Sequence, residues 1–274
     1  MAVLSAADLA FWEENGYVII HDAVPPENLT AVIDLIWDFL GVDRNDSEAW
    51  YRVPISKAGM LEVYQHPALW ANRQYPRVYG AFTQLWQTEK LWVSIDRANM
   101  NPPARPDWDY QGMYHWDIDT FKNPLPFMMQ GVLYLADTAA DQGGFHCTPG
   151  FHRHFAEWVK TQPADRNPFR PDPTGLEIKT IPGQAGDLLI WNSMLPHGNS
   201  RNQSSTPRLA QYITMYPAKT NEEERQYRIK AWQERLPPQG KAFPGDPRGW
   251  EQQHGTTAEL SELGKKLLGL TNYD

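Results

Sequence analysis

Residues 91–217 form a series of short apolar segments, most of them bounded by Gly or Pro. Such segments are typical of strands, and no run of helices alternates with them as a parallel βαβ sheet requires. Proline is frequent, with 23 residues among 274, and it limits long helices because its ring removes a backbone N–H. An antiparallel double sheet, in the form of a sandwich, jelly roll or barrel, is therefore predicted. Its strands are expected at 91–100, 114–118, 127–135, 145–148, 176–181, 188–191 and 208–216.

Helical patterns flank this region. Apolar side chains recur at helical spacing in 27–40, where Pro26 suits the first turn and Gly41 suits the end. A short strand is expected at 17–20, and further helices at 6–14, 67–88 with a break at Pro76, 152–161, 222–228 and 257–268. The chain is predicted to be one domain, mainly β with flanking helices (α+β), around a double-stranded β-helix. It comprises N-terminal helical support at 1–90, a jelly-roll core at 91–217 and a C-terminal helical extension at 218–274.

Composition and charge argue against several classes of function. The net charge is -8 and the basic residues are scattered, which disfavours a nucleic-acid partner because phosphate binding needs a basic face. No run of 18 apolar residues could span a membrane, and the N-terminus lacks the pattern of a signal peptide. Cys147 is the one cysteine, so no intrachain disulfide forms. We expect a cytoplasmic protein, a monomer or homodimer, that binds a small-molecule substrate.

The candidate metal ligands are two histidines and one carboxylate. His115 and Asp117 stand two residues apart in a segment expected to be extended, where such side chains share a face. His197 follows an apolar strand at a tight His-Gly bend. Two histidines and one carboxylate form the facial ligand set of non-haem Fe(II) oxygenases, and zinc accepts the same residues. Each piece alone also fits a structural role, since a His-x-Asp triplet often arises by chance.

Arg208 is the candidate anion-binding residue. It begins an apolar strand, eleven residues after His197. An arginine beside the core needs a partner, and its guanidinium matches a carboxylate with two parallel hydrogen bonds. The alternative is an arginine at the sheet edge that pairs with a nearby aspartate.

In their order along the chain, these residues carry a resemblance to a known family. Residues 8–217 resemble the phytanoyl-CoA dioxygenase-like family of Fe(II)/2-oxoglutarate oxygenases. The segment that contains Phe151 matches the family's Gly-x-x-x-x-Pro-Gly-Ser-His, with Phe in place of Ser. The matching parts are His115-Trp-Asp117, 129–137, 144–152, His197-Gly-Asn-Ser-Arg-Asn202 and Arg208.

The resemblance implies a role for each matching residue. His115, Asp117 and His197 would hold Fe(II), and Arg208 would bind the distal carboxylate of 2-oxoglutarate. The segment 96–102 is similar to a strand of ectoine-hydroxylase-like members. It implies co-substrate contact for Asn99 and substrate contact for Arg97, while Phe121 and Asn199 match weaker co-substrate positions. Apart from the resemblance, Gln130 and Tyr134 share a strand face and would line the substrate pocket if that face points inward.

The carboxylate of Asp117 favours one reaction over another. Halogenases of this superfamily have Gly or Ala there, so Asp117 favours hydroxylation, or a related oxidation, of a small or medium organic metabolite. O₂ and 2-oxoglutarate would be consumed, and succinate and CO₂ released. Two alternatives stay open. One is a cupin-like metalloenzyme that does not use 2-oxoglutarate, since 186–198 also resembles a cupin motif. The other is a non-catalytic jelly-roll binding protein.

Overall fold

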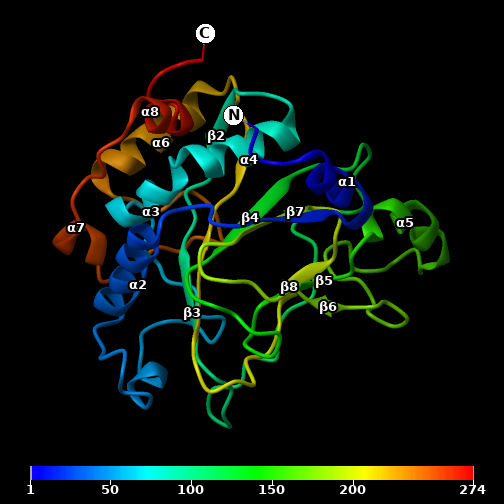
Figure 1. Ribbon diagram of the computed structural model, residues 1–274, viewed down its shortest axis with the longest axis horizontal. Coiled ribbons are helices and arrows are strands. Elements are labelled where there is room, and N and C mark those ends of the chain that lie inside the picture. Colours follow the sequence, from blue (N-terminus) through cyan, green and yellow to red (C-terminus); the bar gives the residue numbers. More distant parts are fainter. Residues whose placement is uncertain (1, 274) are drawn as a thin grey trace.

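The computed structural model describes residues 2–273, and its centre is an antiparallel jelly roll (Figure 1). A five-stranded sheet has the order β1-β7-β4-β9-β3, a three-stranded sheet the order β6-β5-β8, and a strand pair joins β10 to β2. The predicted fold class is therefore confirmed. The strands are β1 (Tyr17–Ile20), β2 (Leu91–Val93), β3 (Ala98–Asn101), β4 (Met129–Tyr134), β5 (Phe145–Cys147), β6 (Lys179–Thr180), β7 (Leu188–Asn192), β8 (His197–Asn199), β9 (Arg208–Tyr212) and β10 (Met215–Pro217).

The five-stranded sheet is apolar on both faces, and each face packs against a different layer. On β4, Val132 and Tyr134 point inward, into a cluster that also contains residues of β5. Leu133 and Leu135 alternate with them and pack outward, into the larger cluster that includes helical residues. This alternation follows from the period of two along a strand. The inner face of the sheet is therefore the face that can present polar side chains to a site.

The helices begin and end at residues suited to those positions. Ser5 accepts a hydrogen bond from the backbone N–H of Asp8, and Gly16 ends the first helix with a left-handed φ of 76°. In Figure 1 the C-terminal helices lie on the side of α2 and α3, away from β5, β6 and β8. The helices are α1 (Ala6–Asn15), α2 (Pro26–Leu40), α3 (Pro67–Arg73), α4 (Pro76–Trp86), α5 (Phe151–Trp158), α6 (Glu222–Glu234), α7 (Trp250–His254) and α8 (Glu262–Leu268), with 3-10 turns η1 (Ala49–Tyr51) and η2 (Val159–Thr161).

Two of the predicted strands are each divided in the structure. The segment 91–100 forms β2 and β3, and 208–216 forms β9 and β10. The division occurs because the strands change partners: β3 pairs with β9 inside the main sheet, whereas β2 pairs with β10 outside it. A hydrogen bond from Ser94 N–H to Thr214 C=O, 2.7 Å long, joins the two crossing points. Apolar alternation continues through both crossings, so the sequence pattern does not reveal them.

Three other predicted elements differ in the structure. The segment 114–118 is not a strand, because only His115 pairs with His197 before Trp116 N–H turns to the carbonyl of Phe169. The predicted strand 176–181 shortens to β6. The predicted helix 257–268 is limited to α8, and α7 was not predicted. Among residues 2–273, no helix has both the length and the apolar character needed to cross a membrane.

Candidate metal centre and anion pocket

His197 comes together with His115 and Asp117 although it lies far from them in the sequence. His115 and His197 exchange two backbone hydrogen bonds of 2.8 and 2.9 Å, which set the two histidines side by side. Gly198 permits this approach, because a Cβ at that position would lie 1.5 Å from the carbonyl oxygen of Met113. The close approach therefore requires glycine after His197, in agreement with the tight His-Gly bend predicted from the sequence.

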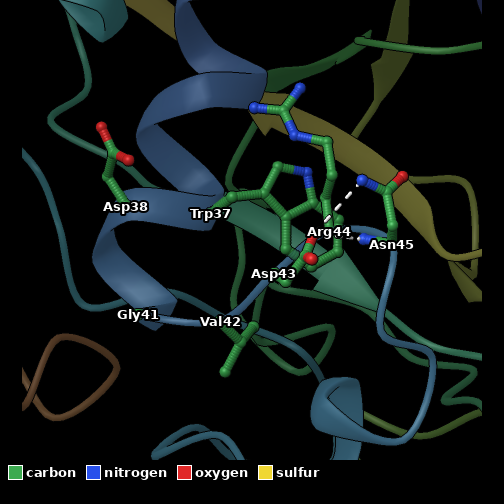
Figure 2. A pocket seen from close by; sticks show the side chains of 7 residues that line it. All are labelled: Trp37, Asp38, Gly41, Val42, Asp43, Arg44 and Asn45. Carbon is green, nitrogen blue, oxygen red and sulfur yellow. Dashed lines mark hydrogen bonds between the residues drawn. The ribbon is translucent and has the colours of Figure 1, made fainter.

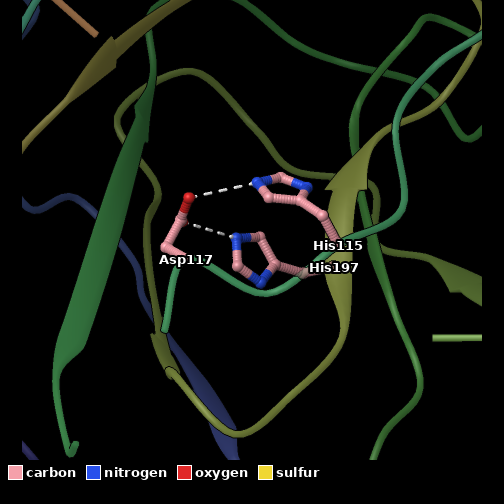
Figure 3. A group of neighbouring side chains, drawn as sticks. All are labelled: His115, Asp117 and His197. Atoms are coloured by element: carbon pink, nitrogen blue, oxygen red, sulfur yellow. Dashed lines mark hydrogen bonds and ion pairs between the residues drawn. The ribbon is translucent and has the colours of Figure 1, made fainter. Parts of the chain in front are cut away.

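The side chains of these three residues converge on one point (Figure 3). His115 Nε2 lies 3.2 Å from Asp117 Oδ1, and His197 Nε2 lies 3.3 Å from Asp117 Oδ2. The potential ligand atoms all lie within 4.8 Å of one another. Two imidazole nitrogens and one carboxylate oxygen in this arrangement suit a divalent first-row transition metal.

Hydrogen bonds favour the charged form of the Asp117 carboxylate and orient the His197 ring, so the cluster suits a cation. Burial alone would raise the pKa of Asp117, but the hydrogen bonds from His115 and His197 outweigh it and hold the pKa well below its usual range. His197 Nδ1 donates to the carbonyl of Leu195 at 2.9 Å, because a carbonyl only accepts. Nε2, the atom that faces Asp117, is thus the ring nitrogen that would supply a lone pair to a bound metal. The fixed tautomer and the ionised carboxylate both fit a metal site.

Aromatic rings enclose one side of the cluster. His197 is 3% exposed, and its ring centroid lies 4.9 Å from that of Trp191 and 5.8 Å from that of Phe145. The Phe145 ring is nearly parallel to the imidazole, at 21°. Asp117, by contrast, has a side chain that is 40% exposed. The cluster therefore has a rigid apolar wall on the histidine side and an open carboxylate side.

Arg208 lies on the inner face of the main sheet and defines what we call the anion pocket, together with Asn99, Asn199 and Tyr212. The Arg208 side chain is fully buried, and its Nη1 donates to Asn99 Oδ1 at 3.1 Å and to Tyr212 Oη at 3.3 Å. Its Nε and Nη2 are buried without a partner. A buried cation with unused donors is costly unless an anion completes it. The pocket therefore fits one carboxylate group of a ligand such as 2-oxoglutarate.

Asn99 and Asn199, two predicted co-substrate residues, both belong to this pocket. Asn99 Nδ2 donates to the carbonyl of Ala58, which leaves its Oδ1 directed at Arg208. Asn199 Nδ2 donates to Tyr212 Oη at 2.8 Å. Tyr212 was not singled out from the sequence, although it lies four residues after Arg208 on the same strand and therefore on the same face. That spacing is the signal that could have found it.

Tyr110 is a further buried residue near the anion pocket that the sequence did not identify as one. Burial raises the pKa of Tyr110 to about 12, and the charges that act on its phenol include Tyr212 and Arg208. Tyr110 lies in an irregular segment two residues before Gly112, whose φ is 87°. No periodicity marks such a segment, so its approach to the pocket is evident only from the fold.

The two residues predicted on β4 differ in their contacts. Gln130 Nε2 donates to Asp117 Oδ2 at 2.8 Å, so this residue reaches the metal-ligand cluster itself. Tyr134 is fully buried, and its hydroxyl donates to the carbonyl of Ile181 at 2.8 Å. The Tyr134 ring also occupies the space beside Gly183, where a Cβ would lie 2.8 Å from it. These contacts give Tyr134 a packing role, and a substrate contact for it stays a prediction.

Arg97 and Phe121, the remaining predicted residues, lie outside the cluster and the anion pocket. Arg97 is 8% exposed, and its Nη1 donates to Glu62 Oε1 at 2.7 Å. Its guanidinium lies over the Phe243 ring, 4.7 Å from the centroid. Phe121 is 53% exposed, with its ring over the guanidinium of Arg166. Arg97 is thus held by neighbours on two sides, and a co-substrate contact for Phe121 stays a prediction.

Two other histidines have structural partners. His152 Nε2 contacts the carbonyl of Glu13 at 3.1 Å, and His146 Nε2 contacts that of Met113 at 3.0 Å. Burial lowers the pKa of both rings. Neither ring belongs to the ligand cluster of the described residues.

Two surface cavities have linings that do not include the cluster or Arg208. One, of about 380 Å³, lies at the end of α2 beside Trp37, Arg44 and Asn45 (Figure 2). Two of its polar side chains have local partners, since Arg44 pairs with Asp34 and Asn45 bonds Asp43. The other cavity, of about 310 Å³, lies between Glu62 and the C-terminal segment 235–252. This cavity is linked to a predicted site residue through Glu62, which pairs with Arg97.

The jelly roll and the His-Asp-His cluster together define the class of non-haem metal oxygenases. Sequence comparison specifies the family within it: the profile of the phytanoyl-CoA dioxygenase family matches residues 12–210, and the chain belongs to that family. Its class is therefore that of the Fe(II)/2-oxoglutarate dioxygenases, as the sequence predicts.

Individual relatives and one solved structure are similar to this chain. A Dictyostelium discoideum relative named after phytanoyl-CoA dioxygenase is 26% identical, over 77% of this chain and 75% of that protein. Ectoine dioxygenase of Bordetella bronchiseptica is 25% identical, over 75% of this chain and 73% of its own length. The epimerase SnoN, solved with Fe3+, alpha ketoglutarate and nogalamycin RO, shares the fold with a TM-score of 0.57 at 17% identity, over 77% of this chain and 83% of SnoN.

Proposed function

We propose that this protein hydroxylates a small or medium organic metabolite, with His115, Asp117 and His197 as the Fe(II) ligands. The observation that carries the proposal is the pairing of two features on the inner side of one jelly roll. One is the converging set of two histidines and a carboxylate. The other is a fully buried arginine with two unused N–H groups. Family membership favours this interpretation over the cupin-like and non-catalytic alternatives.

Different residues of the chain bind 2-oxoglutarate, orient the guanidinium of Arg208 and exclude water from the metal site. Arg208 binds the distal carboxylate of 2-oxoglutarate through Nε and Nη2, which have no other partner. Asn99 and Tyr212 hold the guanidinium from the opposite side and so fix its direction. The wall of Trp191 and Phe145 excludes water from the histidine side of the metal site. Arg97, which lies outside the cluster and the anion pocket, is proposed to contact the substrate.

Bound Fe(II) with 2-oxoglutarate supplies the activation of O₂ that lets a C–H bond be replaced by C–OH. The protein contributes position and a dry enclosure. Asp117 supplies a charged ligand where halogen-transferring relatives lack one, which supports hydroxylation. His197, held by Leu195, presents Nε2 to the metal in one tautomer.

The experiment measures succinate formed from 2-oxoglutarate by the purified protein with Fe(II), across a panel of metabolites. Asp117→Ala is expected to abolish turnover, because it removes one of three metal ligands. Asp119→Ala is the matched control: Asp119 lies two residues on and accepts a hydrogen bond from Phe121 N–H. Full turnover by Asp117→Ala, or equal loss in both variants, would refute the assignment of Asp117 as a ligand.

A further inference from the structure

One polar side chain contacts the proposed metal site without belonging to the ligand set. Gln130 Nε2 donates to Asp117 Oδ2 at 2.8 Å, whereas His115 Nε2 lies nearest to Asp117 Oδ1, at 3.2 Å. Gln130 Oε1 is buried and has no partner. Among residues 2–273, the bond to Asp117 is therefore the one hydrogen bond made by the polar end of this side chain.

The strand that carries Gln130 is well placed to hold a ligand still. β4 lies between β7 and β9, so it is paired on both sides. The register sets Gln130 opposite Trp191 of β7, and the Trp191 ring lies 4.9 Å from that of His197. One cross-strand pair thus contacts two of the three ligands: the amide contacts Asp117 and the indole contacts His197. A site supported by paired strands is held more rigidly than one supported by loops.

Asp117 needs such support more than the histidines do. His115 pairs with His197 through two backbone hydrogen bonds, and His197 lies within β8. Asp117 lies after this ladder has ended, in an irregular segment, and its side chain is 40% exposed. An exposed carboxylate on irregular backbone rotates among several orientations unless a donor fixes it. Among the described residues, Gln130 is the one donor to Asp117 outside the ligand set.

We propose that Gln130 is a positioning residue that holds the Asp117 carboxylate in its metal-binding orientation. The proposal rests on the proposed function, because it takes Asp117 as a ligand. Outer hydrogen-bond partners of metal ligands typically contribute a factor of about 10 to 100 in metal affinity. Gln130, first expected to line the substrate pocket, then acts on the metal instead of on the substrate.

The test is a titration of the metal-free, full-length protein with Co(II), followed by visible absorption. Gln130→Leu removes the amide at similar side-chain volume. It is expected to weaken Co(II) binding by about 10-fold to 100-fold. The ligand-field bands of the bound Co(II) are also expected to change, because the carboxylate is no longer held in one orientation.

Val132→Ala is the matched control. Val132 lies two residues along β4 on the same face and is fully buried, so its truncation damages the same core without touching Asp117. It is expected to lower the thermal midpoint Tm while Co(II) affinity and spectrum stay those of the wild type. The inference is overturned if Gln130→Leu binds Co(II) with wild-type affinity and spectrum, or if Val132→Ala loses as much affinity. If the wild type binds no Co(II), or Asp117→Ala binds it equally well, the proposed function itself fails.

Discussion

Arg208 and Arg228 are both buried arginines, but their surroundings differ. Arg228 lies on α6, within what we call the C-terminal buttress, formed by α6, α7 and α8. It is 7% exposed and donates to the carbonyls of Val93, Leu267 and Leu268 and to the hydroxyl of Tyr216. Arg208 is fully buried, yet two of its three guanidinium nitrogens have no partner.

The difference shows that satisfaction of hydrogen bonds, more than burial, separates a structural charge from a binding charge. Desolvation of an ion is costly, and folding tolerates it when every donor has an acceptor. Arg228 meets this condition within the protein, and it joins the buttress to β2 through Val93. Arg208 meets it only when an anion is added. The same residue type therefore stabilises the fold in the C-terminal buttress and is proposed to bind a ligand in the anion pocket.

The largest expected effect comes from Arg208→Met, which removes the guanidinium and keeps a long side chain. Binding of 2-oxoglutarate in the presence of Mn(II) is expected to weaken by about 100-fold or more, because a buried charge pair is lost. The Tm is not expected to fall, since the unused N–H groups disappear with the charge. Calorimetric titration and thermal unfolding measure the two effects. Unchanged 2-oxoglutarate affinity would restore the cupin-like alternative.

Arg228→Met makes the same chemical change in the buttress and is expected to act in the opposite way. It leaves buried carbonyl groups without donors, each at a cost of about 1 to 3 kcal/mol. The Tm is therefore expected to fall by at least about 5 °C, whereas the 2-oxoglutarate affinity of the folded protein is retained. If both Met variants lost stability equally, the contrast between the two arginines would be wrong.

The C-terminal buttress also contains a buried acid, Glu251, which can be compared with its buried arginine. Burial raises its pKa to about 8, against hydrogen bonds of 2.7 Å from the backbone N–H groups of Tyr64 and Gln65. A carboxyl whose pKa is raised on folding favours the folded state most at low pH. The free energy of unfolding is thus expected to fall as pH rises from about 4.5 to about 8.

Urea unfolding between pH 5 and 9 measures this fall. Glu251→Gln has no charge to gain, so its stability curve is expected to be flatter across the same interval. The variant is also expected to be less stable at pH 5, because its amide NH₂ cannot accept from a backbone N–H. An equal slope for both proteins would show that another group sets the pH dependence.

The smallest expected effect is that of Tyr212→Phe. Tyr212 Oη accepts from Arg208 and from Asn199, and it is not expected to contact the ligand. Its loss removes support from the guanidinium, and 2-oxoglutarate affinity is expected to fall by about threefold to tenfold, as for one neutral hydrogen bond. Titration of both variants with 2-oxoglutarate compares the affinity lost in Tyr212→Phe with that lost in Arg208→Met. A loss as large as that of Arg208→Met would assign Tyr212 a direct contact.

Elements that depend on local signals were predicted well from the sequence. The strand β1 and the helix α2 have clear caps and periodicity, and both form within one residue of the expected bounds. His115, Asp117 and His197 were predicted to meet, and the structure brings them together. In each case a short sequence pattern, such as the spacing of apolar residues or a His-Gly bend, is the physical cause of the local structure.

Features that depend on partners distant in sequence were not predicted. The bond between Gln130 and Asp117 requires β4 to lie beside a segment that is not a strand. The crossing at Ser94 and Thr214 depends on a change of strand partners, which leaves no mark on apolar alternation. The helix α7 follows a Pro- and Gly-rich stretch, and its Glu251 is held by backbone groups nearly two hundred positions earlier in the chain, at Tyr64 and Gln65.

The two-faced packing of β4 has a consequence for redesign and for natural divergence. Leu133 and Leu135 are committed to the outer packing layer, while the inner face carries Gln130 and the residues that follow it at every second position. Changes at Gln130 are therefore expected to act on the proposed metal site, whereas changes at Val132 and Tyr134, which pack on the same face, disturb the inner core. Neither kind of change reaches the outer layer that holds the sheet to its helices, so variants of the inner face of β4 would separate metal binding from the stability of the inner core.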